Sequence, residues 1–202
     1  MSTIQPATPG DPGSAASLIR ATDPGVWDYL FAHAPEDFDT FAAALWRAPG
    51  NSYSHEHAFE ILDEQGRRVA LEVAYTGGIE RELTRRVGPI ASEVLSESSL
   101  AALQARAEYI DYLTPAIPAR DLYLHFLSVA PSHRGSGLGR RLLAHFEDVG
   151  RKAGARALHL DVYVGNPAIE IYRAAGYGIV VETRFPGKTG LPPHYRMIRE
   201  LS

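Results

Sequence analysis

Hydrophobic and polar positions change their period along this chain, and the clearest pattern lies in its second half. Residues 121–129 (DLYLHFLSV) and 156–164 (RALHLDVYV) are apolar runs of strand length. Between them lies an amphipathic helical pattern that Gly154 ends, with apolar residues on one side at Leu138, Leu142, Leu143, Phe146 and Val149. Strand, helix and strand within about 44 residues predict a βαβ unit with parallel strands and a right-handed crossover.

The flanking segments predict further helices and strands. Before the βαβ unit, the pattern favours two helices, a hairpin and then one or two helices, in this order: 15–32, 35–47, 57–63 with 68–75, and 79–113. After it, we expect a helix over 167–175 and strands over 177–183 and 195–201. Two prolines in the TPAIP segment at 114–118 end the helical region, because neither fits inside a helix.

The composition is that of an ordinary globular protein. The chain has 202 residues, of which 45% are hydrophobic and 22% charged. It has no cysteine, which excludes disulfides, thiolate metal sites and cysteine nucleophiles. No apolar window of membrane-spanning length occurs, and the first residues have neither a basic nor an apolar run. We therefore expect a cytoplasmic protein without a membrane anchor or signal peptide.

Charge is distributed unevenly. Residues 1–120 carry 17 acidic and 9 basic side chains, whereas residues 121–202 carry 7 acidic and 11 basic ones. This split favours an anionic ligand for the second half and cationic partners for the first, although solvated surface charge would give the same count. Basic runs interleaved with aromatic residues are absent, so we expect no nucleic-acid partner.

A glycine-rich turn, RGSGLG at 134–139, joins the first strand of the βαβ unit to its helix. The first amides of a helix have no intrahelical partner, and the helix dipole is positive there, so an anion is the natural ligand. Glycines let an anion approach the backbone, and Arg134 adds a fixed positive charge. The alternative is a tight turn that needs glycine for positive φ, but it accounts poorly for three glycines beside an arginine.

Two common nucleotide motifs do not match this turn. A phosphate-binding loop of the Walker type needs Lys followed by Ser or Thr after its glycines, and none follows here. The dinucleotide fingerprint GxGxxG differs from the spacing of Gly135, Gly137 and Gly139, and Asp161 is placed in the middle of the second strand rather than at its end. Nicotinamide binding is therefore disfavoured.

The spacing Arg134-x-x-Gly137-x-Gly139 after a strand resembles the acyl-CoA loop of the GNAT superfamily of N-acetyltransferases. The segment from Asn166 to Tyr177, NPAIEIYRAAGY, resembles the second cofactor motif of that family. The resemblance covers about 121–201 well and the first 120 residues only loosely.

The resemblance implies the fold and the location of the cofactor. It implies a single domain over 1–202, of α/β (α+β) class, with a mixed, mostly antiparallel sheet, a central parallel βαβ pair and flanking helices. Residues 1–120 would form the acceptor-side half, with a helical insertion near 79–113, and 121–202 the acyl-CoA-binding half. Residues expected to contact coenzyme A are Leu127, Val129, Arg134, Gly135, Ser136, Gly137, Leu138, Gly139, Arg140, Asn166 and Tyr172.

The same resemblance implies roles within this set. Amides from Arg134 to Gly139 would bind the pyrophosphate, and the end of the first strand would pair with the pantetheine arm, which requires the two parallel strands to part. Asn166 would contact that arm, and as the residue before Pro167 it is also suited to cap a helix. Tyr172 would protonate the leaving thiolate, although a half-buried structural tyrosine is the alternative.

The proton acceptor is harder to predict. His125 and Glu72 are the first candidates, the histidine because imidazole titrates near neutral pH. Strict alternation along the strand would point His125 away from Leu124 and Phe126, and a histidine bonded within the core is the alternative role. Glu108 and His194 are further candidates. His55 and His57 would lie on opposite faces of a strand, so we expect no metal site.

These expectations favour an N-acyltransferase that uses acetyl-CoA as co-substrate and acts by direct attack in a ternary complex. The acceptor would be an amine on a small molecule or a peptide, and the protein would be a monomer or homodimer. A non-catalytic module that binds or senses acyl-CoA is the alternative, and a nucleotide-binding oxidoreductase is a third class.

Overall fold

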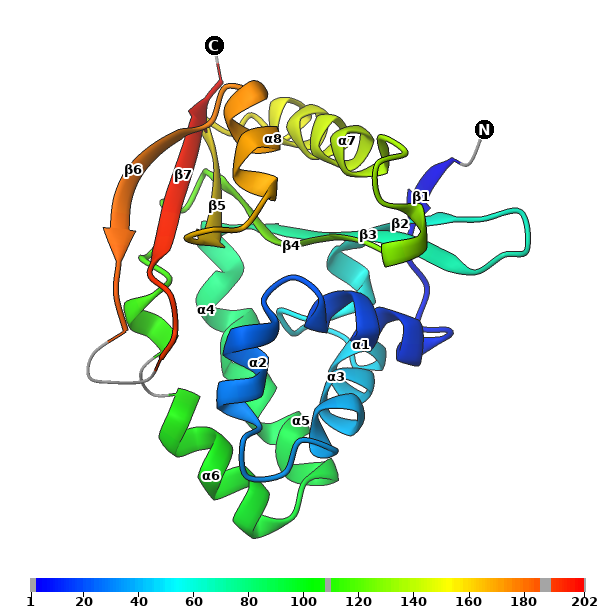
Figure 1. Ribbon diagram of the computed structural model, residues 1–202, viewed down its shortest axis with the longest axis vertical. Helices are drawn as coiled ribbons and strands as arrows, with labels where there is room; N and C mark the ends of the chain where they lie inside the picture. The colour runs from blue at the N-terminus through cyan, green and yellow to red at the C-terminus, as the bar shows by residue number, and fades with distance from the viewer. Residues whose placement is uncertain (1–2, 108–109, 186–189, 202) are drawn as a thin grey trace.

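A seven-stranded sheet forms the centre of the computed structural model, which describes residues 3–107, 110–185 and 190–201 (Figure 1). Its strand order is β1-β2-β3-β4-β5-β7-β6, with β4 and β5 parallel and the other neighbouring strands antiparallel. The strands are β1 (Ile4–Pro6), β2 (Ala58–Leu62), β3 (Arg68–Thr76), β4 (Leu122–Val129), β5 (Ala157–Tyr163), β6 (Gly178–Thr183) and β7 (His194–Glu200). The predicted mixed sheet with a central parallel pair is confirmed.

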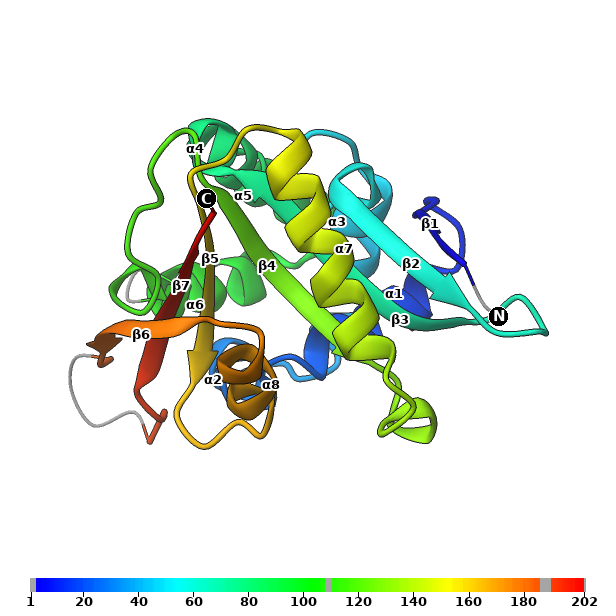
Figure 2. The ribbon, with the colours of Figure 1, turned by 90° about the horizontal axis from the view of Figure 1, so that it is seen from above.

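Helices α7 (Leu138–Lys152) and α8 (Ala168–Ala174) cover one face of this sheet (Figure 1). Figure 2 shows α7 running across the sheet above β3 and β4. The apolar side predicted for this helix is the buried one: Leu143 and Phe146 pack in a cluster with Leu124 and Leu158 of the parallel pair. Burying such side chains contributes roughly 1.5–3 kcal/mol each, which fixes α7 over the strands that it connects.

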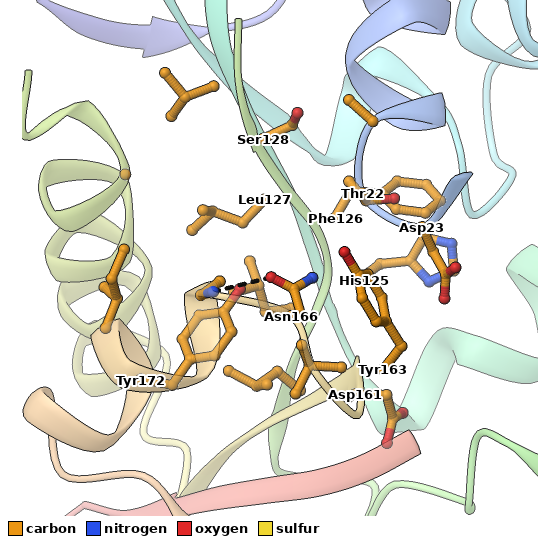
Figure 3. Close-up of a pocket in the computed structure, with 18 of the residues that line it drawn as sticks. Thr22, Asp23, His125, Phe126, Leu127, Ser128, Asp161, Tyr163, Asn166 and Tyr172 are labelled. Atoms are coloured by element: carbon orange, nitrogen blue, oxygen red, sulfur yellow. Dashed lines mark hydrogen bonds between the residues drawn. The ribbon is translucent and has the colours of Figure 1, made fainter. Parts of the chain in front are cut away.

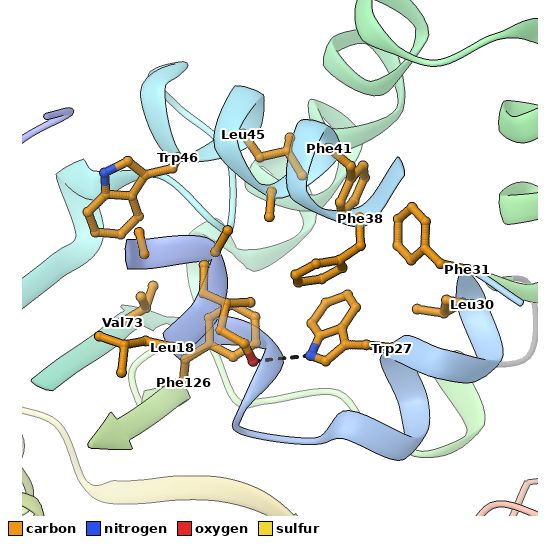
Figure 4. Packing of buried hydrophobic residues seen from close by; sticks show 14 of the residues in the cluster. Leu18, Trp27, Leu30, Phe31, Phe38, Phe41, Leu45, Trp46, Val73 and Phe126 are labelled. Carbon is orange, nitrogen blue, oxygen red and sulfur yellow. Dashed lines mark hydrogen bonds between the residues drawn. The ribbon is translucent and has the colours of Figure 1, made fainter. Parts of the chain in front are cut away.

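The remaining helices lie on the other side of the sheet (Figure 1). They are α1 (Pro12–Arg20), α2 (Pro24–Leu30), α3 (Asp37–Arg47), α4 (Gly77–Arg85), α5 (Val87–Val94) and α6 (Glu97–Ala107). Their core is rich in aromatic side chains, with the rings of Trp27 and Phe38 5.1 Å apart and Trp46 fully buried (Figure 4). No helix within the described ranges has the length and apolarity needed to cross a membrane.

Three elements differ from the predicted pattern. The single helix expected over 15–32 is two helices, because the Asp23 side chain accepts a bond from Val26 N (3.1 Å) and Pro24 begins a new first turn. The helical region expected over 79–113 contains three helices, α4 to α6. Strand β1 was not predicted, since three residues with a proline carry too weak a pattern.

A β-bulge interrupts β4 at His125. Along β3, Val73 pairs with Phe126 and the next residue, Ala74, pairs with Leu124, so His125 has no partner on that strand. The extra residue moves Phe126 to the face covered by α1 and α3, while Leu127 packs on the α7 face. The predicted strict alternation is therefore wrong beyond His125.

Candidate active site

The parallel strands β4 and β5 stay paired only over their first residues. Their register runs from Leu122 opposite Leu158 to Leu124 opposite Leu160. Beyond that point β4 continues against β3, and β5 continues against β7. The two strands therefore part, as the resemblance required, and a cavity of about 660 Å³ opens between their ends (Figure 3).

One end of this cavity is formed by the glycine loop. Gly137 precedes α7 with φ +84° and no side chain caps the helix, so its first amides face the loop without a side-chain acceptor. A Cβ built on Gly135 or Gly137 would have no atom within 4 Å, so the backbone here is open to a ligand. Arg134 and Arg140 line the same cavity, so this end is suited to an anion.

The cavity brings together nearly all the residues expected to contact a cofactor. Every residue in that predicted set except Ser136 lines it. Ser136 instead donates its hydroxyl to the carbonyl oxygen of His133 within the loop (2.5 Å). The two sequence motifs, about 30 residues apart, thus meet in one site.

Asn166 and Tyr172 approach the cavity from the β5 side (Figure 3). The Asn166 side-chain oxygen accepts a bond from Ala168 N (2.9 Å), so this residue caps α8 as predicted. Tyr172 is 7% exposed and packs near the Tyr177 ring, with ring centroids 6.1 Å apart. Burial raises the pKa of Tyr172 to about 12, so this phenol keeps its proton at neutral pH and is a donor toward the cavity.

His125, at the bulge, also lines the cavity. Its Nδ1 lies 2.7 Å from the Tyr75 hydroxyl. The Tyr53 ring packs edge-on against the imidazole, with the two ring centroids 5.4 Å apart. Burial lowers the pKa of His125 to about 3. A histidine this weakly basic remains neutral at pH 7 and is a poor proton acceptor, so its environment favours positioning over general-base work.

Glu72 lies outside the lining of the cavity. It is 1% exposed, is not among the residues that line the cavity, and bonds through Oε1 to His145 Nδ1 on α7. Burial raises the pKa of this carboxyl. Glu72 is therefore placed to join β3 to α7, and the geometry does not support the predicted role as base. The candidate Glu108 lies outside the described residues.

A carboxylate–imidazole pair, Asp23 and His194, occupies the end of the cavity away from the loop. Of the two, only His194 was a predicted candidate. His194, at the start of β7, has its Nε2 2.7 Å from Asp23 Oδ2, and both residues line the cavity. The sequence DP at 23–24 signals a helix start, but nothing in it indicates a partner 171 positions away. Nearby, Asp161 accepts bonds from Arg196 and from the Tyr123 hydroxyl.

The histidines near position 55 are arranged differently from the prediction. His55–His57 form a 3₁₀ turn rather than part of a strand, and His55 Nδ1 lies 2.8 Å from the Trp46 carbonyl oxygen. Among residues 3–107, 110–185 and 190–201, no group of three or more His, Cys, Asp or Glu side chains could hold a metal ion.

Part of the chain is similar to known sequences. Residues 101–177 match the family described as "Acetyltransferase (GNAT) family". Over 57 residues the chain is 46% identical to a streptothricin acetyltransferase of Streptomyces lavendulae. That stretch is 28% of this chain and 30% of the relative, so the chain matches less than a third of the relative's length.

Solved structures extend the likeness to the whole fold. An N-acetyltransferase from Staphylococcus aureus Mu50 aligns over 98% of this chain and 100% of its own, with TM-score 0.74 and 15% identity. The NatC complex bound to Gag peptide and CoA aligns over 100% of this chain and 99% of the matched chain, with TM-score 0.56 and 14% identity. At such identities these structures show a shared fold.

Proposed function

Because residues 101–177 match the GNAT acetyltransferase family and the fold is shared with an N-acetyltransferase, we propose that the protein transfers an acetyl group from acetyl-CoA to an amine acceptor. The observation that carries this proposal is one cavity that joins the glycine loop of α7 to Tyr172 through the gap between β4 and β5. Acetyl-CoA would supply a thioester carbonyl that is already activated for attack.

The loop end of the cavity suits the pyrophosphate of coenzyme A. The free amides at the start of α7, the positive end of its dipole and the arginines at 134 and 140 are all donors to an anion. Gly137 keeps the backbone open at the point where phosphate oxygens would approach. The coenzyme-bearing relative of this fold, the NatC complex, supports the same choice of ligand.

The parted strands suit the pantetheine arm. Along Leu127–Val129, β4 bonds to β3 on one side, while its other edge faces the cavity instead of β5. An extended arm that carries amides can bond to such an edge as an added strand would. Because the loop follows shortly after Val129, the arm would run from there back along β4, and the thioester would lie nearer Leu127, where a strand amide would stabilise the developing negative charge on the carbonyl oxygen.

Tyr172 is proposed as the proton donor. The acceptor's nitrogen forms a bond to the carbonyl carbon and releases one proton to water, while the carbon–sulfur bond breaks and the departing sulfur takes one proton from Tyr172, which water then replaces. The Tyr172 phenol is protonated and lines the cavity, and Asn166 holds the start of its helix. Binding donor and acceptor together in this cavity provides the proximity contribution to the rate.

The test is kinetic comparison of the wild type with Tyr172→Phe, in which only the hydroxyl is removed. Loss of a general acid lowers kcat by about 100-fold, whereas the KM for acetyl-CoA changes little. Tyr177→Phe is the matched control, because Tyr177 is a buried neighbour that is not among the cavity-lining residues.

Equal loss in both variants would indicate a packing role for Tyr172. If coenzyme A binds but no amine in a broad panel is acetylated by the wild type, the alternative of a non-catalytic acyl-CoA-binding module replaces the enzyme. Thermal stabilisation by NAD and none by coenzyme A would favour the oxidoreductase class.

A further inference from the structure

The end of the cavity away from the glycine loop contains charged groups that acetyl transfer from coenzyme A does not use. Asp161 is among them, but both of its oxygens accept bonds from Arg196, whose side chain is 3% exposed. The negative charge of Asp161 is therefore matched by a buried arginine. This leaves Asp23 and its partner His194 as the groups available to a ligand.

The Asp23 carboxyl is bonded to a backbone amide and to an imidazole. One carboxylate oxygen accepts a bond from Val26 N, and the other lies 2.7 Å from His194 Nε2. An imidazole donates such a bond without the fixed positive charge of a guanidinium or ammonium group. Within the described residues Asp23 has no ion pair with an arginine or lysine, and its side chain is 19% exposed.

The cavity is consequently polarised along its length. The arginines that line it, Arg134 and Arg140, belong to the glycine loop and the start of α7. Asp23, on the loop between α1 and α2, lies at the other end. A positively charged group on an acceptor is attracted to the Asp23 end and repelled from the loop end.

The walls beside Asp23 are aromatic. Trp27, Tyr53 and Tyr163 line the cavity there, together with the neutral imidazole of His125. Flat rings cover the methylene groups of an alkyl amine, and their faces also attract ammonium groups. This part of the site therefore fits an alkylammonium chain better than an anionic or strongly hydrated neutral acceptor.

The charge that Asp23 binds is not on the nitrogen that reacts. Tyr172 and Asp23 lie on opposite sides of the cavity, with Leu127, Asn166 and His125 between them (Figure 3). A carboxylate beside the reacting nitrogen would stabilise its protonated form, which cannot attack a carbonyl. The geometry points to an acceptor with two separate nitrogens, one reacting near Tyr172 and the other positively charged at Asp23.

We propose that Asp23, held in place by His194, binds a second, non-reacting ammonium group of the acceptor, so that the protein selects diamines or similar polycationic amines. This inference rests on the proposed acetyl transfer. It assigns Asp23 a role in binding and specificity, and His194 a positioning role.

The test compares two amines of equal chain length, cadaverine with an amine at each end and pentylamine with only one. We expect the wild type to have a KM for cadaverine at least about ten-fold below that for pentylamine. Asp23→Asn removes the charge but keeps an oxygen that caps α2, so folding is preserved. This variant should lose the preference, because its KM for cadaverine rises toward that for pentylamine.

Asp148→Asn is the matched control, since it removes an equal charge from an exposed position on α7. His194→Gln should reduce the preference without abolishing it, because the carboxylate remains but loses its partner. Binding of cadaverine to the coenzyme A complex, measured by calorimetry, gives a second readout that does not need turnover.

The outcomes separate the two proposals. Acetylation of both amines with equal KM, unchanged by Asp23→Asn, overturns the role of Asp23 and leaves the proposed function intact. Absence of acetylation with any amine overturns the proposed function. In that case, cadaverine binding that Asp23→Asn abolishes still supports the ammonium site, and equal binding by both proteins rejects it.

Discussion

At the scale of single residues, the three glycines of the loop are not needed for the same reason. Gly135 and Gly137 have φ of +78° and +84°, which side-chain-bearing residues rarely adopt, so a tight turn accounts for these two. Gly139 has no such need: a Cβ there would make ordinary contacts with Val129 and Leu127, at 3.7 and 3.9 Å. Its helical position beside the anion-binding end therefore fits close approach of a ligand better than a turn requirement.

The first prediction concerns Gly137→Ala. Forcing alanine to positive φ costs about 1 kcal/mol of unfolding free energy, and it displaces the amides that would bind pyrophosphate. We expect acetyl-CoA binding, measured by calorimetry, to weaken several-fold.

Gly154→Ala is its control, because Gly154 has φ +69°, lies just beyond the other end of α7 and is equally unobstructed. It should lose similar stability in chemical denaturation but keep its affinity for acetyl-CoA. Equal loss of affinity in both variants would contradict a specific role for the loop.

The roles of some side chains were predictable from the sequence, and the orientations of others were not. The cap formed by Asn166 was predictable, because the residue before a proline at a helix start has a local role. The orientation of residues beyond His125 was not, because a bulge depends on the partner strand. Glu72 lies in a strand buried on both faces, so alternation could not indicate which face it occupies.

At the scale of elements, strands β5 and β7 are joined by a buried ion pair beside the cavity. Asp161 and Arg196 lie directly opposite each other and form two bonds of 2.7 Å. Arg196 also donates to the Pro115 carbonyl oxygen, which ties the segment before β4 to the same place. Such a pair fixes the positions of its elements, because loss of one partner leaves a buried charge without compensation.

The second prediction is that Arg196→Met lowers the free energy of unfolding by about 3–5 kcal/mol, measured by chemical denaturation. Replacing both partners, as Asp161→Leu with Arg196→Met, should restore most of that stability because no charge remains buried. Arg173→Met, which removes an exposed pair with Glu170, should cost less than about 1 kcal/mol. A cost for Arg196→Met no larger than for Arg173→Met would contradict this account.

Elements with a strong local pattern were predicted well. The amphipathic α7 and the apolar strands on either side of it agree with the structure to within one or two residues at their ends. The helical region before β4 was less well predicted, because its helices are short and their boundary signals, Gly88-Pro89 in the first turn of α5 and the Ser96 cap before α6, are weak. The pairing of Asp23 with His194 joins segments far apart in the chain and has no local signal.

At the scale of the whole molecule, the uneven charge of the sequence agrees with the polarity of the cavity. The second half of the chain has the excess of basic residues, and it supplies the glycine loop with Arg134 and Arg140. The acidic first half supplies Asp23 at the opposite end. A coenzyme with phosphates and an acceptor with a positive charge would each meet the complementary end.

The most direct test of the central claim is to incubate the purified protein with acetyl-CoA and a panel of amines that includes cadaverine, and to follow both products by mass spectrometry. The account predicts an acetylated amine and free coenzyme A in equal amounts, with formation slowed about 100-fold in Tyr172→Phe. Coenzyme A binding without any acetylated amine, or release of free acetate in place of it, would contradict the account.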